Sequence, residues 1–147
     1  MGEERGMVLV DSSVWIEAAR RQGDLATKVA LRALLDEYEA AWCSPVKLEV
    51  LGGARREERR ALERFFGVIP YAECCEADWE AAKALAWRAR DAGHTLPWND
   101  VLISATAAAR GWRIFSRDAH FATLAGLGGA AIYRPGYGGS YQAETEL

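Results

Sequence analysis

Residues 7–15, with the sequence MVLVDSSVW, decide the expected fold. The first four are apolar and do not alternate with polar residues, which is typical of a strand covered on both faces, as in a parallel sheet. Asp11 follows the apolar run, and Ser12 or Ser13 is the expected cap of a helix that begins there. Asp11 therefore stands at the carboxyl end of a strand, where open α/β sheets bind their ligands. The alternative is that Asp11 serves only as a turn or capping residue.

The composition is that of an ordinary globular domain. The chain has 147 residues, of which 50% are hydrophobic and 27% charged, so a single domain can bury about two-thirds of the surface of the unfolded chain. The formal net charge of −3 argues against a protein that coats nucleic acid by bulk electrostatics, although it permits a local basic patch. The N-terminus is charged, which argues against a signal peptide. No apolar run approaches the length of about 20 residues that a membrane span needs, so we expect a cytoplasmic protein.

The cysteines of the chain are Cys43, Cys74 and Cys75, an odd number without Cys-x-x-Cys spacing. The adjacent pair cannot chelate zinc in its usual geometry. We therefore interpret all three as small hydrophobic residues of a protein in a reducing cytoplasm.

Strand and helix patterns alternate along the chain. Short apolar runs predict strands at residues 7–10, 40–43 and 112–115, an edge strand at 130–133, and a linker or short strand at 68–70. Amphipathic stretches between them predict helices, of which the longest covers residues 76–92. This alternation predicts an α/β fold whose parallel sheet has helices on both faces. We expect one domain over residues 1–135, followed by a flexible Gly- and Tyr-rich tail over residues 136–147.

Four acidic residues fall where this layout brings elements together. Asp11 ends the first strand, Glu49 lies about one turn into the helix after the second strand, Asp100 opens an apolar helix, and Asp118 follows the strand at 112–115. Strand carboxyl ends and helix amino ends meet at the same edge of a doubly wound sheet, so we expect these side chains to converge. Helix amino termini also favour negative charge and help to keep the acids ionised.

Convergence of four carboxylates requires a counter-charge. Two carboxylates about 4 Å apart repel by roughly 4 kcal/mol at an effective dielectric constant of about 20, whereas a whole domain is stable by only about 5–15 kcal/mol. A bound hard cation removes this repulsion, and an acidic site made only of oxygen ligands selects Mg²⁺ or Mn²⁺. We expect no imidazole or thiolate of the kind that zinc prefers beside the acids. The alternative is that each acid caps its own helix independently.

Four segments that contain these acids resemble the signature blocks of PIN-domain nucleases, and most closely those of the VapC-type toxins of prokaryotic toxin–antitoxin pairs. The segments are VDSSVWIE, SPVKLEVLGG, WNDVLISATA and IFSRDAHF, and the resemblance runs from residue 7 to about residue 133. It implies a three-layer α/β/α sandwich with a central parallel sheet, cleavage of RNA with Mg²⁺ or Mn²⁺, homodimerisation, and inhibition by a cognate antitoxin. It maps the family's acidic quartet onto Asp11, Glu49, Asp100 and Asp118, and a supporting hydroxyl onto Ser116.

The members of the acidic quartet have distinct expected roles. Asp11 and Asp100 would hold the metal, with Asp118 bound directly or through water, and Glu49 would bind a second ion or orient the attacking water. No Ser-His-Asp or Cys-His arrangement competes, and a catalytic histidine pair would need both histidines of the chain in the crevice. His120, two residues after Asp118, contacts either the substrate or neighbouring groups at a helix start.

A run of arginines follows the helix that bears Glu49, in the segment RREERRALER. Arg55, Arg56 and Arg59 would contact RNA phosphates and guide the substrate into the site. The alternative is a solvated helix face of mixed charge, which is the commoner role of such a run.

Tryptophans on the long helix predict an assembly. Trp79 and Trp87, together with the apolar helix near the amino terminus, offer more hydrophobic surface than one sandwich can cover. We therefore expect a homodimer, with apolar surface left for an antitoxin segment that docks as a helix in a groove.

Other classes of protein also place an aspartate after the first strand. Haloacid-dehalogenase-like phosphatases need a second aspartate where Ser13 stands, and the late loop SRD lacks the lysine of response-regulator receivers. The remaining alternative is a catalytically silent PIN-like module that binds RNA or protein without cutting it.

Overall fold

A central parallel sheet carries the fold. The computed structural model describes residues 6–135, and within them β1 (Val8–Val10), β2 (Ala40–Cys43), β3 (Tyr71–Ala72) and β4 (Arg113–Phe115) pair in the order β3-β2-β1-β4. All three pairings are parallel. The residues of β1 are fully buried between its two neighbours, which is the burial predicted from the apolar run without alternation.

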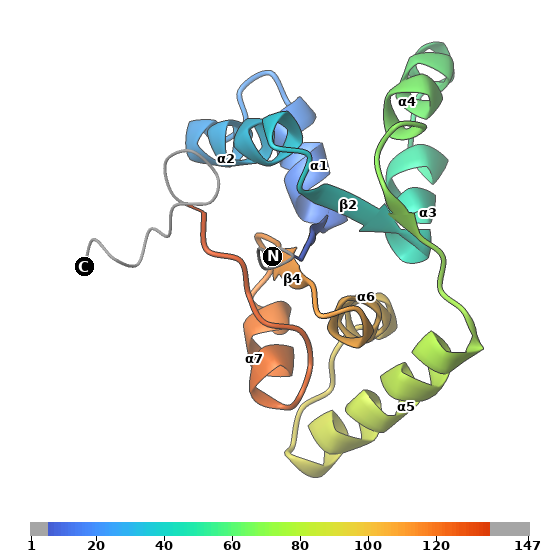
Figure 1. Ribbon diagram of the computed structural model, residues 1–147, viewed down its shortest axis with the longest axis vertical. Coiled ribbons are helices and arrows are strands. Elements are labelled where there is room, and N and C mark those ends of the chain that lie inside the picture. The colour runs from blue at the N-terminus through green and yellow to red at the C-terminus, as the bar shows by residue number, and fades with distance from the viewer. Residues whose placement is uncertain (1–5, 136–147) are drawn as a thin grey trace, which may run out of the picture.

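Helices cover both faces of this sheet. They are α1 (Ser12–Ala19), α2 (Leu25–Asp36), α3 (Ser44–Gly52), α4 (Arg59–Phe66), α5 (Glu76–Asp91), α6 (Trp98–Ala109) and α7 (His120–Gly126), with a 3-10 turn, η1 (Arg56–Glu58), before α4. Figure 1 shows α1 and α2 on one face and α5, α6 and α7 on the other, with α3 and α4 beside β3. This arrangement confirms the predicted three-layer α/β/α sandwich.

Two of the predicted strands differ from the structure. Residues 130–133 form only one parallel bridge, between Ile114 and Ile132, so this segment is not a strand. Its residues Ala130 and Tyr133 are nevertheless buried, which shows that the apolar run reflects burial in the core and not a ladder of hydrogen bonds. The third strand begins just after the predicted 68–70 segment, where the carbonyl of Pro70 accepts a hydrogen bond from the backbone N–H of Trp42 at 3.0 Å.

The sheet and its helices account for the described part of the chain. Within residues 6–135, none of the helices combines the length and the apolar character needed to cross a membrane. The tail predicted over residues 136–147 lies outside the described residues.

Candidate functional site

Asp11 lies at the end of β1 and caps α1. The prediction that Ser12 or Ser13 is the cap is wrong, because Asp11 is the last residue with extended backbone and its carboxylate accepts a hydrogen bond from Ser13 N at 3.2 Å. The hydroxyls of Ser13 and Ser116 donate to the same oxygen, at 2.7 and 2.9 Å. Asp11 is only 4% exposed, and this burial raises the pKa of its carboxyl group even though the serine hydrogen bonds oppose the shift.

Glu49 is held from two sides by neighbouring helices. Ser12 Oγ, on α1, donates to Oε1 of Glu49 at 2.7 Å. Asn99 Nδ2, on α6, donates to Oε2 at 3.0 Å. An exposed glutamate on α3 is therefore fixed at both of its carboxylate oxygens, and three helices meet at this one side chain.

Asp100 and Asp118 face each other across His120. Nδ1 of His120 lies 2.8 Å from Asp100 Oδ2 and 2.9 Å from Asp118 Oδ1. One ligand atom from each of the three residues lies within 4.8 Å of the other two. Burial raises the pKa of Asp100, and the charges of Asp11 and Asp118 add to this rise, while the hydrogen bond from His120 opposes it. That same hydrogen bond to Asp100 is the main reason that the pKa of His120 is raised.

The four predicted acids come together at one edge of the sheet. The charge of Glu49 raises the pKa of Asp11, and the charges of Asp11 and Asp118 raise the pKa of Asp100, so each acid interacts electrostatically with another. Ser116 links two of them, since its hydroxyl donates to Asp11 and accepts from the backbone N–H of Asp118 at 2.9 Å. Asp100 and Asp118, with His120, form the group whose ligand atoms lie within 4.8 Å of one another. Asp11 is joined to this group through Ser116, and Glu49 is joined to Asp11 through its charge.

The arginine run lies apart from the polar contacts of this cluster. Arg55, Arg56 and Arg59 are all exposed, on η1 and at its two ends. Arg55 pairs with Glu58 at 2.8 Å, and Arg59 donates to the carbonyl of Ala54 at 3.1 Å. Among the hydrogen bonds and ion pairs of the described residues, none joins these three arginines to an acid of the quartet.

The residues that orient the acids could not be identified from the sequence. Ser12 and Ser13, which the sequence predicts only as caps, hold Glu49 and Asp11, and Asn99, one residue before Asp100, also holds Glu49. The expectation that no imidazole stands beside the acids is wrong, because His120 lies between Asp100 and Asp118. Their positions in the sequence are the one signal that points to them, since each of these polar residues lies within two positions of an acid of the quartet.

The donor set fits a divalent cation. Carboxylate oxygens dominate it, and such oxygens are the ligands that Mg²⁺ and Mn²⁺ prefer. The raised pKa values of Asp11 and Asp100 have burial as their first cause and neighbouring negative charge as a further one. A cation among these groups would offset both effects, because it stabilises the ionised carboxylates.

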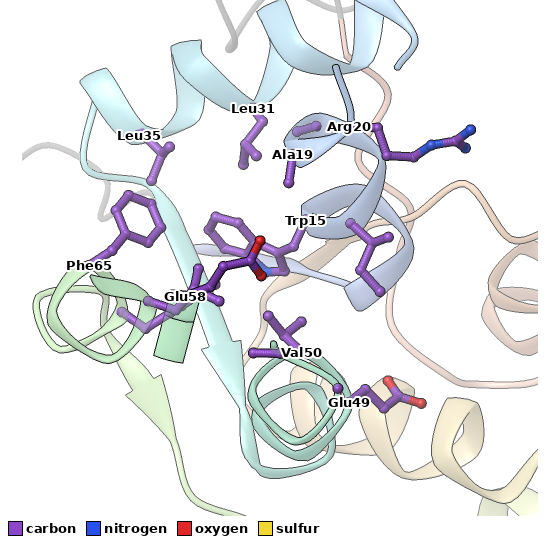
Figure 2. Close-up of a pocket in the computed structure, with 15 residues that line it drawn as sticks. Trp15, Ala19, Arg20, Leu31, Leu35, Glu49, Val50, Glu58 and Phe65 are labelled. Carbon is purple, nitrogen blue, oxygen red and sulfur yellow. The ribbon is translucent and has the colours of Figure 1, made fainter. Parts of the chain in front are cut away.

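An apolar groove opens beside the acidic cluster. Its volume is about 520 Å³, and it lies between α1, α2, α3 and α4. Figure 2 shows Trp15, Leu31, Leu35 and Phe65 around this groove, with Glu49 at its edge. The groove therefore ends at a residue of the quartet.

Comparison with known proteins agrees with the fold and with the four segments. The PIN domain family model matches residues 8–127. Ribonuclease VapC11 of Mycobacterium tuberculosis is 40% identical over 124 residues, which cover 81% of this chain and 92% of that protein.

Solved structures show the same fold at low sequence identity. FitAcB from Neisseria gonorrhoeae superposes with a TM-score of 0.71 at 20% identity, covering 88% of this chain and 98% of its own. A toxin–antitoxin complex from Klebsiella pneumoniae gives a TM-score of 0.62 at 21% identity, covering 76% and 87%. With the family model and the VapC relatives, these likenesses lead to one conclusion: the chain belongs to the PIN-domain family, in its VapC branch.

Proposed function

We propose that this protein is a metal-dependent endoribonuclease, with Mg²⁺ or Mn²⁺ as its cofactor, and that it acts as the toxin of a toxin–antitoxin pair in the cytoplasm. The observation that carries the proposal is the convergence of Asp11, Glu49, Asp100 and Asp118 from four separate elements. Its relatives that are named as VapC ribonucleases support RNA as the substrate.

The residues of the cluster have separate proposed roles. Asp11, Asp100 and Asp118 would hold the ion, with His120 beside them. When bound, the ion would supply Lewis-acid polarisation of the scissile phosphate and a more acidic water. Glu49 accepts hydrogen bonds at both oxygens and is the candidate to orient the attacking water.

Substrate contact is proposed for the arginine run. Arg55, Arg56 and Arg59 are exposed, so their guanidinium groups are accessible to RNA phosphates. Because positioning contacts to phosphate carry no sequence information, such a role would affect affinity and not the choice of cleavage site.

An antitoxin is the proposed occupant of the groove in Figure 2. The groove is lined mostly by apolar side chains such as Leu31, Leu35 and Phe65, which suits the apolar face of an amphipathic helix. A helix in this position would reach the edge at which Glu49 lies. The structural neighbour from Klebsiella pneumoniae is itself a toxin–antitoxin complex, which supports this class of partner.

The test is RNA cleavage by an Asp100→Asn variant, compared with Asp91→Asn as a matched control at an exposed position on α5. Asp100→Asn keeps the size of the side chain and removes one negative charge. We expect it to fold at least as well as the wild type without metal, because a repulsive pair is gone, and to lose about 100-fold or more of the cleavage rate with Mg²⁺ or Mn²⁺. Asp91→Asn should cleave normally.

Two results would contradict this assignment. A folded Asp100→Asn protein that cleaves RNA at the wild-type rate would remove the acidic quartet from the mechanism. A pure wild-type protein that cleaves no RNA with either metal would favour the alternative, a silent PIN-like module that binds RNA or protein.

A further inference from the structure

Two cysteines that are far apart in the sequence are neighbours in the fold. Cys43 is the last residue of β2, and it lies opposite Ala72 in the parallel pairing with β3. Cys74 follows Ala72 by two residues, and its backbone N–H donates to Ser44 Oγ at 3.0 Å. The ends of the two strands therefore hold the Cys43 and Cys74 side chains next to each other, and the two thiols share a hydrogen bond.

The two thiols differ in pKa. The hydrogen bond from Cys43 is the main reason that the pKa of Cys74 is lowered, to about 6, and the hydroxyls of Thr106 and Ser44 act in the same direction. Thr106 Oγ1 lies 3.3 Å from Cys74 Sγ. The same hydrogen bond, together with burial, raises the pKa of Cys43, which is fully buried. Cys74 is therefore the more acidic and the more accessible of the two thiols, and Cys43 is the fully buried thiol beside it.

The third cysteine is adjacent in sequence but has a different environment. Cys75 is exposed, and its thiol lies 3.4 Å from Asp78 Oδ2, to which it donates. The expectation that all three cysteines are small hydrophobic residues agrees with the burial of Cys43 in the core and of Cys74 partly against it, and it is wrong for the exposed Cys75.

We propose that Cys43 and Cys74 form a two-thiol oxidation site, at which Cys74 reduces a hydroperoxide and then forms a disulfide with Cys43. In the first step the Cys74 sulfur attacks one peroxide oxygen, the O–O bond breaks, and the alcohol leaves with a proton while Cys74 becomes a sulfenic acid. In the second step the Cys43 sulfur displaces the hydroxyl group of that sulfenic acid, and water leaves with the Cys43 proton. The two sulfurs lose two electrons, and the peroxide is reduced by the same two.

The disulfide would connect the start of α3 to the segment before α5. It would close a loop of about 30 residues in the unfolded chain, and such a cross-link stabilises a protein chiefly by restricting its unfolded state. The site is separate from the acidic cluster in its chemistry, and the proposal does not depend on RNA cleavage.

The experiment treats the reduced protein with hydrogen peroxide, blocks the remaining thiols with iodoacetamide, and maps the peptides by mass spectrometry. We expect a Cys43–Cys74 cross-linked peptide that has lost the mass of two hydrogen atoms, a higher melting temperature than that of the reduced protein, and reversal of both by dithiothreitol. Cys75→Ser is the matched control and should form the same cross-link, because serine keeps a hydroxyl donor for Asp78. Cys43→Ala should stop at a sulfenic acid on Cys74, which dimedone would trap.

Three outcomes would overturn the proposal. They are a disulfide between Cys74 and Cys75, a disulfide between two molecules in place of one within the chain, and oxidation of Cys75 while Cys43 and Cys74 stay reduced. The wild-type peptide map decides among them without any variant, so poor folding of Cys43→Ala would leave the test intact.

Discussion

The orientation of the Glu49 carboxylate is fixed by its neighbours in the folded protein. An exposed glutamate on a helix normally samples many rotamers. Fixing it in one rotamer costs about 1.5–2 kcal/mol of conformational entropy. Here Ser12 and Asn99 each donate to one carboxylate oxygen, so the ordering is already present in the folded protein. The proposed orientation of water by Glu49 thus depends on two neutral residues that never need to contact the substrate.

We predict that Ser12→Ala and Asn99→Ala each lower the rate of single-turnover RNA cleavage by about tenfold, because each frees one oxygen of Glu49. The two effects should combine less than additively in the double variant, since both act through the same carboxylate. Thr95→Ala, which removes a hydroxyl from the exposed loop before α6, is the control and should leave the rate unchanged. A double variant with wild-type activity would show that Glu49 needs no support.

The acids could be predicted from the sequence, whereas their orienting partners could not. Asp11 and Asp118 follow apolar strands, and the carboxyl ends of parallel strands share one edge of the sheet whatever the side chains around them. The partner of Ser12 depends instead on how α1, α3 and α6 cross, which is set by packing of side chains from the whole core. The local sequence pattern carries no information on how these three helices cross. From the sequence alone, Ser12 and Asn99 can be identified only as residues at the starts of helices.

At the scale of elements, one buried ion pair joins α5 to α6. Arg110, directly after α6, donates to both carboxylate oxygens of Asp78 on α5, at 2.9 and 3.2 Å. The side chain of Asp78 is only 3% exposed. The hydrogen bond from Arg110 is the main reason that the pKa of Asp78 lies below its ordinary value of 3.8.

We predict that Asp78→Ala lowers the free energy of unfolding by about 3 kcal/mol at pH 7, because it leaves the Arg110 charge partly buried without its partner. The pKa of Asp78 is lower in the folded state than in the unfolded state. The stabilisation is therefore complete above pH 3.8 and is lost as the pH falls through the folded pKa. Urea unfolding from pH 7 down to acid should show the gap between wild type and variant closing at the acid end. Asp91→Ala on the same helix should show neither effect.

The element boundaries show a similar limit of local information. The helix predicted at residues 76–92 is present as α5, because its apolar stripe packs against α6. The run at 130–133 has the same apolar character as β1 but pairs at a single bridge. Apolar composition indicates burial in both cases, and only the positions of neighbouring strands decide which segment forms a ladder.

Taken as a whole molecule, the protein gathers negative charge at one edge, and we predict that a divalent cation stabilises the entire fold. An ion at about 100 times its dissociation constant adds about 2.7 kcal/mol, which corresponds to a rise in melting temperature of about 5–10 °C for a chain of this size. Thermal melts with EDTA and with excess Mn²⁺ measure this difference. An Asp11→Asn, Asp100→Asn double variant should show little of it, and coincident wild-type melts would mean that the cluster binds no metal.

The face formed by α5 and α6 offers an apolar surface for assembly. Trp79, Trp87 and Trp98 are 54%, 61% and 67% exposed and border a groove of about 640 Å³ along α5 and α6. We predict that two copies associate through this face, since a cluster of exposed tryptophans of this kind is typical of an interface. Light scattering at micromolar concentration should give the mass of a dimer for the wild type and of a monomer for Trp87→Glu. Val68→Glu, at an exposed apolar residue outside this groove, should remain dimeric. A monomeric wild type would contradict the dimer and leave the proposed cleavage untouched.

The origin of the four acids in separate parts of the chain has a consequence for the cell that makes this protein. Translation delivers Asp11 first, but Asp118 emerges only after the ribosome has passed β4, the strand that pairs with β1. Until that strand is in place, the growing polypeptide carries acids without a shared site. A chain whose synthesis stops before β4 therefore lacks both Asp118 and the strand that pairs with β1, so the complete cluster exists only once nearly all of the described residues have been made.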